Sequence, residues 1–239
     1  MDKWESVSQM PSLVMIPGVL CDRRLFADQI PALQAHAEIS VADITQQTTV
    51  EQMAQAVLAN APKSFCLAGF SLGSQVALEI MQIAGDRVDR LALLSATHGG
   101  LLPASAAAFR KALEPIEQGG FQPYLDDVFP RYFTERDAQN PELKQIFMDM
   151  AHSVGQDAGL RQMRALLELR QPFKNLDRIR CRTMIIGGVE DHRTTLEAHE
   201  ILAREIAGSE LVKIEDSAHF TTLEQPAALT AALLRWLTG

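Results

Sequence analysis

Ser71 stands in a sequence pattern that can turn a serine hydroxyl into a nucleophile. It is the centre of the pentapeptide Gly69-Phe70-Ser71-Leu72-Gly73, a G-x-S-x-G pattern. A short apolar run, residues 65–68, precedes it, and Val76 and Ile80 follow it on one face of a helical pattern. This order predicts a strand, a tight turn with the serine at its tip, and a helix, which together form a nucleophile elbow. The two glycines remove side-chain bulk beside a serine held in a strained backbone conformation.

A serine hydroxyl is weakly nucleophilic and needs a base that removes its proton and later returns it to the leaving group. Histidine can do both near neutral pH. Among the six histidines, His219 is the one that follows the last strand-like run, residues 210–214, and precedes the last helical pattern. His192 also follows a strand-like run, but it lies in the loop that is expected to supply an acid to orient the histidine. We therefore predict that His219 is the base.

The segment Gly187-Gly188-Val189-Glu190-Asp191 supplies two candidate acids after the strand-like run at residues 183–188. An acid here would hold the imidazole in the right tautomer and stabilise the imidazolium. Asp191 is preferred because the spacing Gly188-x-x-Asp191 places it beyond the end of the strand, whereas Glu190 is interpreted as a solvated loop charge. Asp216, three residues before His219, is interpreted as a turn residue. The predicted triad is Ser71, Asp191 and His219.

Apolar runs and helical patterns alternate along the chain on both sides of a central helical stretch. Repeated strand and helix pairs imply a mostly parallel sheet with helices on both faces, in which ligands bind beyond the carboxyl ends of the strands. All three members of the predicted triad lie on loops that follow strands. The six predicted strands cover residues 13–16, 39–43, 65–68, 88–94, 183–188 and 210–214.

Three T-x-x-E patterns predict where helices begin, because a threonine oxygen and a glutamate carboxylate can satisfy the free amides of a first turn. They are residues 48–51, 194–197 and 221–224. From about residue 102 to 173 strand-like runs are absent and helical patterns cover 109–116, 124–132, 143–152 and 160–169. We interpret this stretch as an inserted helical lid. The predicted division is a first core part at 1–101, a lid at 102–173 and a second core part at 174–239.

Net charge, cysteine content and the absence of long apolar runs limit the partners and the cellular compartment that we expect for this protein. The 239 residues carry a net charge of −8, with 30 acidic and 22 basic residues, which argues against nucleic acid or an anionic membrane surface as the main partner. Three distant cysteines suggest a reducing compartment without a disulfide framework. The sequence shows no secretory apolar segment and no run near the ~18 residues of a membrane span, so a cytoplasmic protein is expected. His192 and His199 lack a third ligand at metal-binding spacing, so no metal is expected.

Three stretches together resemble a known family. They are Gly69-Phe70-Ser71-Leu72-Gly73, Gly188-Val189-Glu190-Asp191, and Ala218-His219-Phe220 with Leu223-Glu224-Gln225-Pro226. Across nearly its full length the chain resembles the α/β-hydrolase superfamily. It is most similar to small, lid-bearing bacterial carboxylesterases, a group that includes the pimeloyl-carrier-protein methyl ester esterases. The resemblance implies the α/β-hydrolase fold and the chain order serine, acid, histidine.

Acyl transfer also needs two fixed N–H donors for the carbonyl oxygen that becomes negative. The Leu72 amide, just after the nucleophile at a helix N-terminus, is one candidate. By resemblance the second is the Val19 amide, with Leu20 as the fallback. The family often has His-Gly after its first core strand, where this chain has Pro17-Gly18-Val19-Leu20. The mechanism remains possible because the donor at this place is a backbone amide.

These features predict a serine hydrolase that cleaves small-molecule carboxylic esters through an acyl-enzyme on Ser71, without a cofactor or a metal. A lid rich in Leu, Phe and Met favours small to medium apolar acyl or alcohol groups. The same triad would serve a thioesterase, a lactonase or a C–C bond hydrolase, and a slow-turnover ligand-binding receptor is an alternative of another class. Multiple-turnover kinetics separate the enzyme from the receptor.

The resemblance also suggests a substrate that is attached to an acyl-carrier protein, which is acidic. A protein of charge −8 repels such a partner unless a local basic patch attracts it. Arg161, Arg164 and Arg170 are the candidates, but only Arg161 and Arg164 share a helix face. Two arginines would attract an acidic carrier only weakly, so free small esters are the predicted substrates. The sequence does not predict the oligomeric state.

Overall fold

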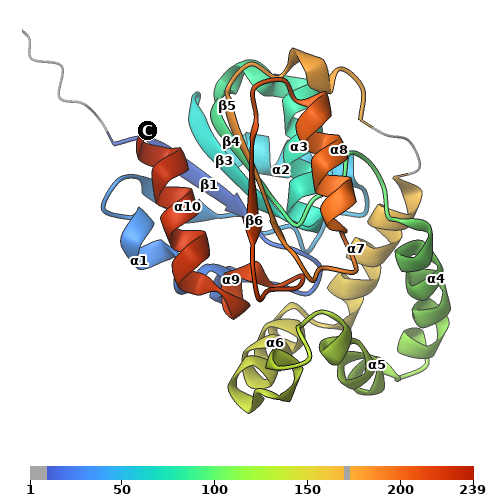
Figure 1. Cartoon of the computed structure of the whole chain (residues 1–239). Coiled ribbons are helices and arrows are strands. Elements are labelled where there is room, and N and C mark those ends of the chain that lie inside the picture. The colour runs from blue at the N-terminus through green and yellow to red at the C-terminus, as the bar shows by residue number, and fades with distance from the viewer. Residues whose placement is uncertain (1–9, 170–172) are drawn as a thin grey trace, which may run out of the picture.

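A six-stranded parallel sheet forms the centre of the protein in a computed structural model that describes residues 10–169 and 173–239 (Figure 1). The strand order is β2-β1-β3-β4-β5-β6, and every neighbouring pair is parallel. The predicted sheet and its six strands are confirmed, with ends that differ by no more than two residues. The strands are β1 (Ser12–Ile16), β2 (Glu38–Val41), β3 (Phe65–Phe70), β4 (Val88–Leu94), β5 (Arg182–Gly188) and β6 (Glu210–Ile214).

Helices cover both faces of this sheet (Figure 1). Because side chains alternate along a strand, Leu13 and Met15 of β1 pack with one set of helices, while Val14 and Ile16 pack with the other. The first set is α1 (Ile30–Leu33) and α10 (Pro226–Thr238), and the second is α2 (Val50–Asn60), α3 (Leu72–Ala84) and α8 (Leu196–Glu205). The near-continuous apolar runs of the strands follow from burial on both faces.

Leu25, Phe26, Ile30 and Leu33 have the spacing of one helix face, which predicts a helix after β1, but this segment is broken in two. A 3₁₀ turn spans Arg23–Phe26, and α1 begins only at Ile30. Pro31 explains the break, because a residue without a backbone N–H belongs in the first turn of a helix and not in its interior.

The helix starts predicted from T-x-x-E patterns need correction. Thr49, not Thr48, caps α2 by accepting from the Gln52 N–H at 3.1 Å. Thr195, not Thr194, caps α8 by accepting from the Ala198 N–H at 3.4 Å. In both cases two threonines are adjacent, and the pattern places the helix start one residue too early.

The third pattern is not a capping box at all. The short helix α9 (Thr221–Glu224) has no side-chain cap, and α10 starts separately at Pro226. The Glu224 carboxylate accepts hydrogen bonds from the backbone amides of Thr134 and Ala218. Long-range partners have therefore replaced the local ones that the sequence pattern suggested.

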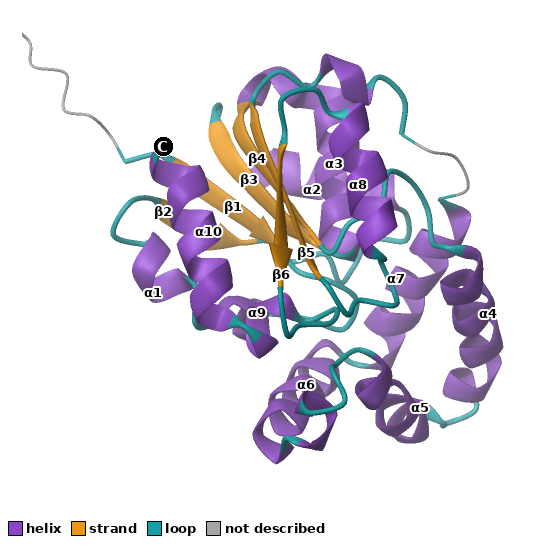
Figure 2. Cartoon of the chain, viewed as in Figure 1, coloured by secondary structure: helices purple, strands orange, loops and turns teal. Residues whose placement is uncertain are grey.

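Four helices gather beyond the carboxyl ends of the strands (Figure 2). They are α4 (Pro103–Glu117), α5 (Phe121–Val128), α6 (Pro141–Val154) and α7 (Gln156–Glu168), and we call them the cap helices. The four helical patterns predicted in this part of the chain are confirmed as helices. The division of the chain at residues 102 and 173 stays a prediction.

Candidate active site

Ser71 occupies the sharp turn between β3 and α3. Its φ of 53° and ψ of −111° are strained for a residue with a side chain. The two glycines of the pattern make this turn possible by allowing close backbone approach. A Cβ on Gly69 would lie 2.2 Å from the Gly73 carbonyl oxygen, and a Cβ on Gly73 would lie 2.1 Å from the Ile16 carbonyl oxygen. The glycines therefore make room for neighbouring backbone.

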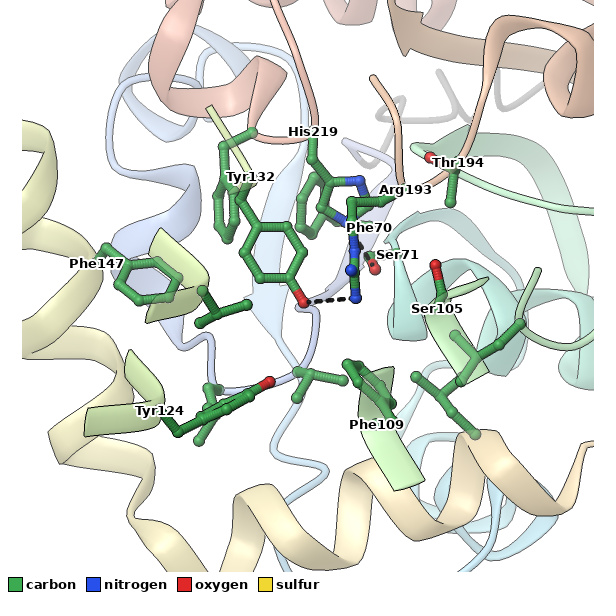
Figure 3. A pocket seen from close by; sticks show the side chains of 16 residues that line it. Phe70, Ser71, Ser105, Phe109, Tyr124, Tyr132, Phe147, Arg193, Thr194 and His219 are labelled. Atoms are coloured by element: carbon green, nitrogen blue, oxygen red, sulfur yellow. Dashed lines mark hydrogen bonds between the residues drawn. The ribbon is translucent and has the colours of Figure 1, made fainter. Parts of the chain in front are cut away.

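Ser71, His219 and Asp191 form a continuous hydrogen-bonded series, of which Figure 3 shows Ser71 and His219. The His219 Nε2 atom lies 3.1 Å from the Ser71 hydroxyl oxygen, and its Nδ1 atom lies 2.8 Å from an Asp191 carboxylate oxygen. With the proton on Nδ1, the imidazole donates to the carboxylate and Nε2 accepts from the serine hydroxyl. This is the geometry in which a serine can lose its proton to a histidine.

Asp191 is buried and held by the residues that follow it. One of its oxygens accepts from the backbone amides of Arg193 and Thr194, and the other accepts from the Thr194 hydroxyl at 2.6 Å. Burial raises the pKa of this carboxyl, but the charge of His219 and these hydrogen bonds outweigh burial and lower the pKa to about 2. Asp191 is thus ionised and oriented. The side chains of Glu190 and His192 are exposed.

The histidine loop fits against the acid loop because Gly188 has no side chain. A Cβ at Gly188 would lie 2.1 Å from the Ala218 carbonyl oxygen. On the other side of the loop, the His219 N–H donates to the Tyr132 carbonyl, and the Ser95 hydroxyl donates to the His219 carbonyl at 2.8 Å. Backbone and side-chain bonds from three elements therefore fix His219. Neither Tyr132 nor Ser95 was singled out from the sequence, which carries no local signal for either.

The loop after β1 lies beside the elbow and holds the predicted second oxyanion donor. Val19 lines the same pocket as Ser71. Among the described residues, no acceptor takes a hydrogen bond from the amide of Val19 or of Leu72. The Leu20 amide, the fallback, instead donates to the side-chain oxygen of Gln162 at 2.9 Å. The Val19 and Leu72 amides remain the candidate donors.

Gln162 is a further site-forming residue that sequence reasoning missed. It lies fully buried on α7, and its amide nitrogen donates to the Ile44 carbonyl while its oxygen accepts from Leu20. Leu20 has a φ of 58°, so the loop that carries Val19 is strained at the residue that Gln162 holds. In the sequence, Gln162 stands among Ala158, Gly159, Ala165 and Leu166 at helical spacing, and a single polar residue on such a helix face is the signal that could have found it.

The candidate pocket is small and mostly apolar. It has a volume of about 50 Å³ and is lined mainly by aromatic and aliphatic side chains around Ser71 and His219 (Figure 3). A second cavity of about 390 Å³ lies between α4 and α5. The two share Phe109, Tyr124, Val128 and Arg193. An apolar group can therefore be held next to the serine.

The arginines considered as a docking patch have partners within the chain. The Arg161 guanidinium donates twice to the Thr45 carbonyl, at 2.8 and 3.0 Å. Arg164 pairs with Glu117, and Arg170 lies outside the described residues. Residues 10–169 and 173–239 contain no grouping of His, Cys, Asp and Glu suited to a metal ion. No helix in that part of the chain is long and apolar enough to cross a membrane.

Comparison with known proteins agrees with the parallel sheet flanked by helices. The model of the alpha/beta hydrolase family matches residues 13–233. A pimeloyl-[acyl-carrier protein] methyl ester esterase of Vibrio atlanticus (strain LGP32) is 25% identical over 195 residues, which cover 78% of this chain and 71% of the relative.

Two solved structures share the fold at low sequence identity. The enol-lactonase of Burkholderia xenovorans LB400 superposes with a TM-score of 0.87 at 21% identity, covering 98% of this chain and 94% of the other. A thermophilic esterase of Thermogutta terrifontis gives 0.84 at 22% identity, covering 96% and 90%. At these identities the structural likeness supports the fold alone.

Proposed function

The chain belongs to the alpha/beta hydrolase family, and we propose that it is a serine hydrolase that cleaves carboxylic esters. The proposal rests on one observation, the hydrogen-bonded series from Ser71 through His219 to Asp191 at the carboxyl end of the sheet. The family match and the esterases among its relatives support it.

In the proposed mechanism, His219 Nε2 removes the Ser71 proton as Oγ attacks the ester carbonyl carbon. Negative charge moves to the carbonyl oxygen, where the Leu72 and Val19 amides stabilise it, and one such donor lowers the barrier by about 3–4 kcal/mol. The imidazolium then gives its proton to the leaving alkoxide, which departs as the alcohol. Water activated by His219 cleaves the acyl-enzyme and releases the acid. Asp191 holds the imidazole and stabilises its charged form throughout.

The apolar lining of the pocket supports small to medium apolar acyl or alcohol groups as the part of the ester next to the scissile bond. Aromatic rings surround His219 closely, with ring centroids of Phe70 and Tyr132 at 5.3 and 5.2 Å from the imidazole. Such surroundings exclude water and strengthen the electrostatic interactions of the site.

A carrier-linked methyl ester is the second candidate substrate, because relatives of this chain are named for it. Such a substrate requires a basic surface on this protein that binds the acidic carrier. Glu117 offsets the charge of Arg164, and the Thr45 carbonyl fixes the partly buried Arg161 guanidinium, so the pair offers an acidic carrier only one uncompensated charge. Free small esters are therefore the first choice.

A fluorophosphonate probe tests the nucleophile. It should label the wild-type protein and the Ser64→Ala control, in which an exposed hydroxyl is removed, but not Ser71→Ala. Turnover of p-nitrophenyl esters should exceed one equivalent per protein and fall on the order of 10⁶-fold in Ser71→Ala. Acyl-thioesters and lactones belong in the same screen. Labelling at another serine, or hydrolysis that survives in folded Ser71→Ala, would overturn the proposal.

A further inference from the structure

Arg193 places a positive charge in the apolar pocket beside Ser71 and His219 (Figure 3). Its backbone N–H belongs to the acid loop and donates to Asp191 at 2.7 Å. Its side chain extends away from that loop to the cap helices. The guanidinium carbon lies 4.9 Å from the centroid of the Tyr132 ring and 5.7 Å from that of Phe109. The two rings fix the guanidinium by cation–π contacts.

The guanidinium has spare hydrogen-bonding capacity. It donates to the Tyr132 hydroxyl at 3.4 Å, and no other partner for it is found among the described residues. No described carboxylate forms an ion pair with it, although Arg131, Arg136, Arg164 and other arginines do form ion pairs. An arginine carries five N–H donors and a permanent charge. A half-buried cation without a counter-ion is unfavourable in apolar surroundings unless a ligand supplies one.

We propose that Arg193 binds a carboxylate carried by the ester substrate, so that the preferred substrates are esters with one free acid group on the acyl or the alcohol side. This inference rests on the proposed function and adds the substrate class. A guanidinium and a carboxylate match as a bidentate pair, with two parallel N–H to oxygen bonds. The apolar lining then contacts the carbon chain between the two ends.

The distance between the charge and the reacting atoms limits the length of the substrate. The guanidinium carbon and the imidazole both lie close to the Tyr132 ring, at 4.9 and 5.2 Å from its centroid, so the two groups are near each other. A carboxylate held by Arg193 is therefore only a few bonds from the scissile carbonyl. Short esters with the acid on the acyl side, such as monomethyl glutarate, and on the alcohol side, such as acetoxyacetate, both satisfy this limit.

The test compares each acid with its neutral amide of nearly equal shape. The pairs are monomethyl glutarate with methyl glutaramate, and acetoxyacetate with acetoxyacetamide. For wild type, kcat/KM should be higher for the acid in at least one pair, and the pair identifies the side that carries the charge. Arg193→Gln should lower this acid-to-amide ratio about 10- to 100-fold, the range expected for hydrogen bonds to a charged group.

Arg131→Gln is the matched control, because Arg131 borders the neighbouring cavity, is more than half exposed and pairs with Asp127. It removes the same charge and should keep the wild-type ratio. A ratio near one in wild type for both pairs, a ratio unchanged in Arg193→Gln, or an equal loss in both variants would overturn the inference while ester hydrolysis through Ser71 still stands.

A binding measurement separates this inference from the proposed function. Titration calorimetry of glutarate into Ser71→Ala and into the Ser71→Ala, Arg193→Gln double variant needs no turnover. A dissociation constant about 10-fold or more weaker in the double variant supports the carboxylate site, even if no ester is hydrolysed. Equal dissociation constants, or no binding to Ser71→Ala, reject the site.

Discussion

The two sides of the pocket are built by different means. On the sheet side, Ser71, Asp191 and His219 lie on loops whose positions follow from strained backbone, close glycine contacts and a dense set of hydrogen bonds. On the cap side, Phe109, Tyr124 and other large side chains present mostly apolar surface. The difference indicates that backbone geometry positions Ser71, Asp191 and His219, whereas side chains determine the shape of the pocket.

The separation between the two sides is incomplete. Gln162 of α7 holds the loop after β1, the Tyr132 carbonyl accepts from the His219 amide, and the Thr134 amide donates to Glu224. Two segments of the cap region, which comprises the cap helices and the residues that connect them, thus support loops of the sheet side: α7 and residues 132–134. Substitutions on each side can show how far the two depend on one another.

After the loss of the nucleophile itself, large effects are expected on the sheet side at the acid and the histidine. Asp191→Asn should lower kcat on the order of 10⁴-fold, because an amide cannot stabilise the imidazolium and favours the wrong tautomer. Glu190→Gln changes an exposed side chain of the same loop and should alter kcat less than about threefold. Steady-state kinetics on one ester measures both, and reversed effects would make Glu190 the acid.

The histidines offer a parallel pair on the same side. His219→Ala should be nearly inactive, whereas His192→Ala removes an exposed imidazole and should keep its activity. Thermal melting of both variants checks that the loss at His219 is not a loss of fold. Substantial turnover in folded His219→Ala would contradict the predicted base.

Gln162→Ala tests whether the cap side contributes to the chemistry. Without the Gln162 oxygen the strained Leu20 turn loses its hydrogen bond, and the Val19 amide loses its fixed position. Because an oxyanion donor acts mainly in the transition state, kcat should fall roughly 10- to 100-fold with little change in KM. Gln145→Ala, an exposed glutamine on α6, is the control. A change in KM alone would mean that Gln162 affects substrate binding and not the chemical step. The cap side would then contribute only to the shape of the pocket.

The parts of the site that the sequence predicts are those whose partners are local. A G-x-S-x-G pattern between a strand and a helix describes the elbow, because the residues that make the turn are adjacent. The order of the acid and histidine loops follows in the same way from the alternation of strands and helices. Gln162 and Glu224 act over 142 and 90 residues of sequence separation, respectively, so nothing near them in the chain reveals their partners.

The capping patterns show how a local rule fails. The pattern predicts Thr194 at a helix start, yet its hydroxyl and amide both hold Asp191, while Thr195 caps the helix. The pattern predicts Glu224 in a first turn, yet its carboxylate joins the cap region to the histidine loop. In both cases the side chain pairs with a buried polar group instead of capping a helix: Thr194 with Asp191 of the same loop, and Glu224 with the distant Thr134 amide.

Titration of Glu224 should have a smaller effect than the substitutions above, and the effect should be on the stability of the protein. Burial raises the pKa of its carboxyl to about 7, against the lowering effect of the Thr134 and Ala218 amides, and the Asp137 charge raises it further. A raised folded-state pKa stabilises the protein below the unfolded value, near 4.5, and this stability is lost as pH rises to about 7. The melting temperature of the wild type should therefore fall over this range.

Glu224→Gln should flatten that fall, because glutamine does not titrate. The difference between the two proteins should be on the order of 3 kcal/mol at most between pH 4.5 and 7.5, with roughly 2–4 °C for each kcal/mol at this chain length. Glu215→Gln, at an exposed position near the same loop, should melt with the wild-type pH dependence. Parallel curves for wild type and Glu224→Gln would show that Glu224 does not titrate in this range.

The smallest effect is expected where the cap region meets solvent. If free small esters are the substrates, kcat/KM for a p-nitrophenyl ester should barely respond to salt between low and high ionic strength, because no long-range charge steering is involved. The Arg161→Ala, Arg164→Ala double variant should match wild type on this ester, since Arg164 is paired with Glu117 on an exposed surface. A carrier-linked ester is the comparison. If that ester were far better, with a rate that fell steeply in salt and in the double variant, then the outer face of the cap would be a docking site for an acidic protein, and small esters would be only partial substrates.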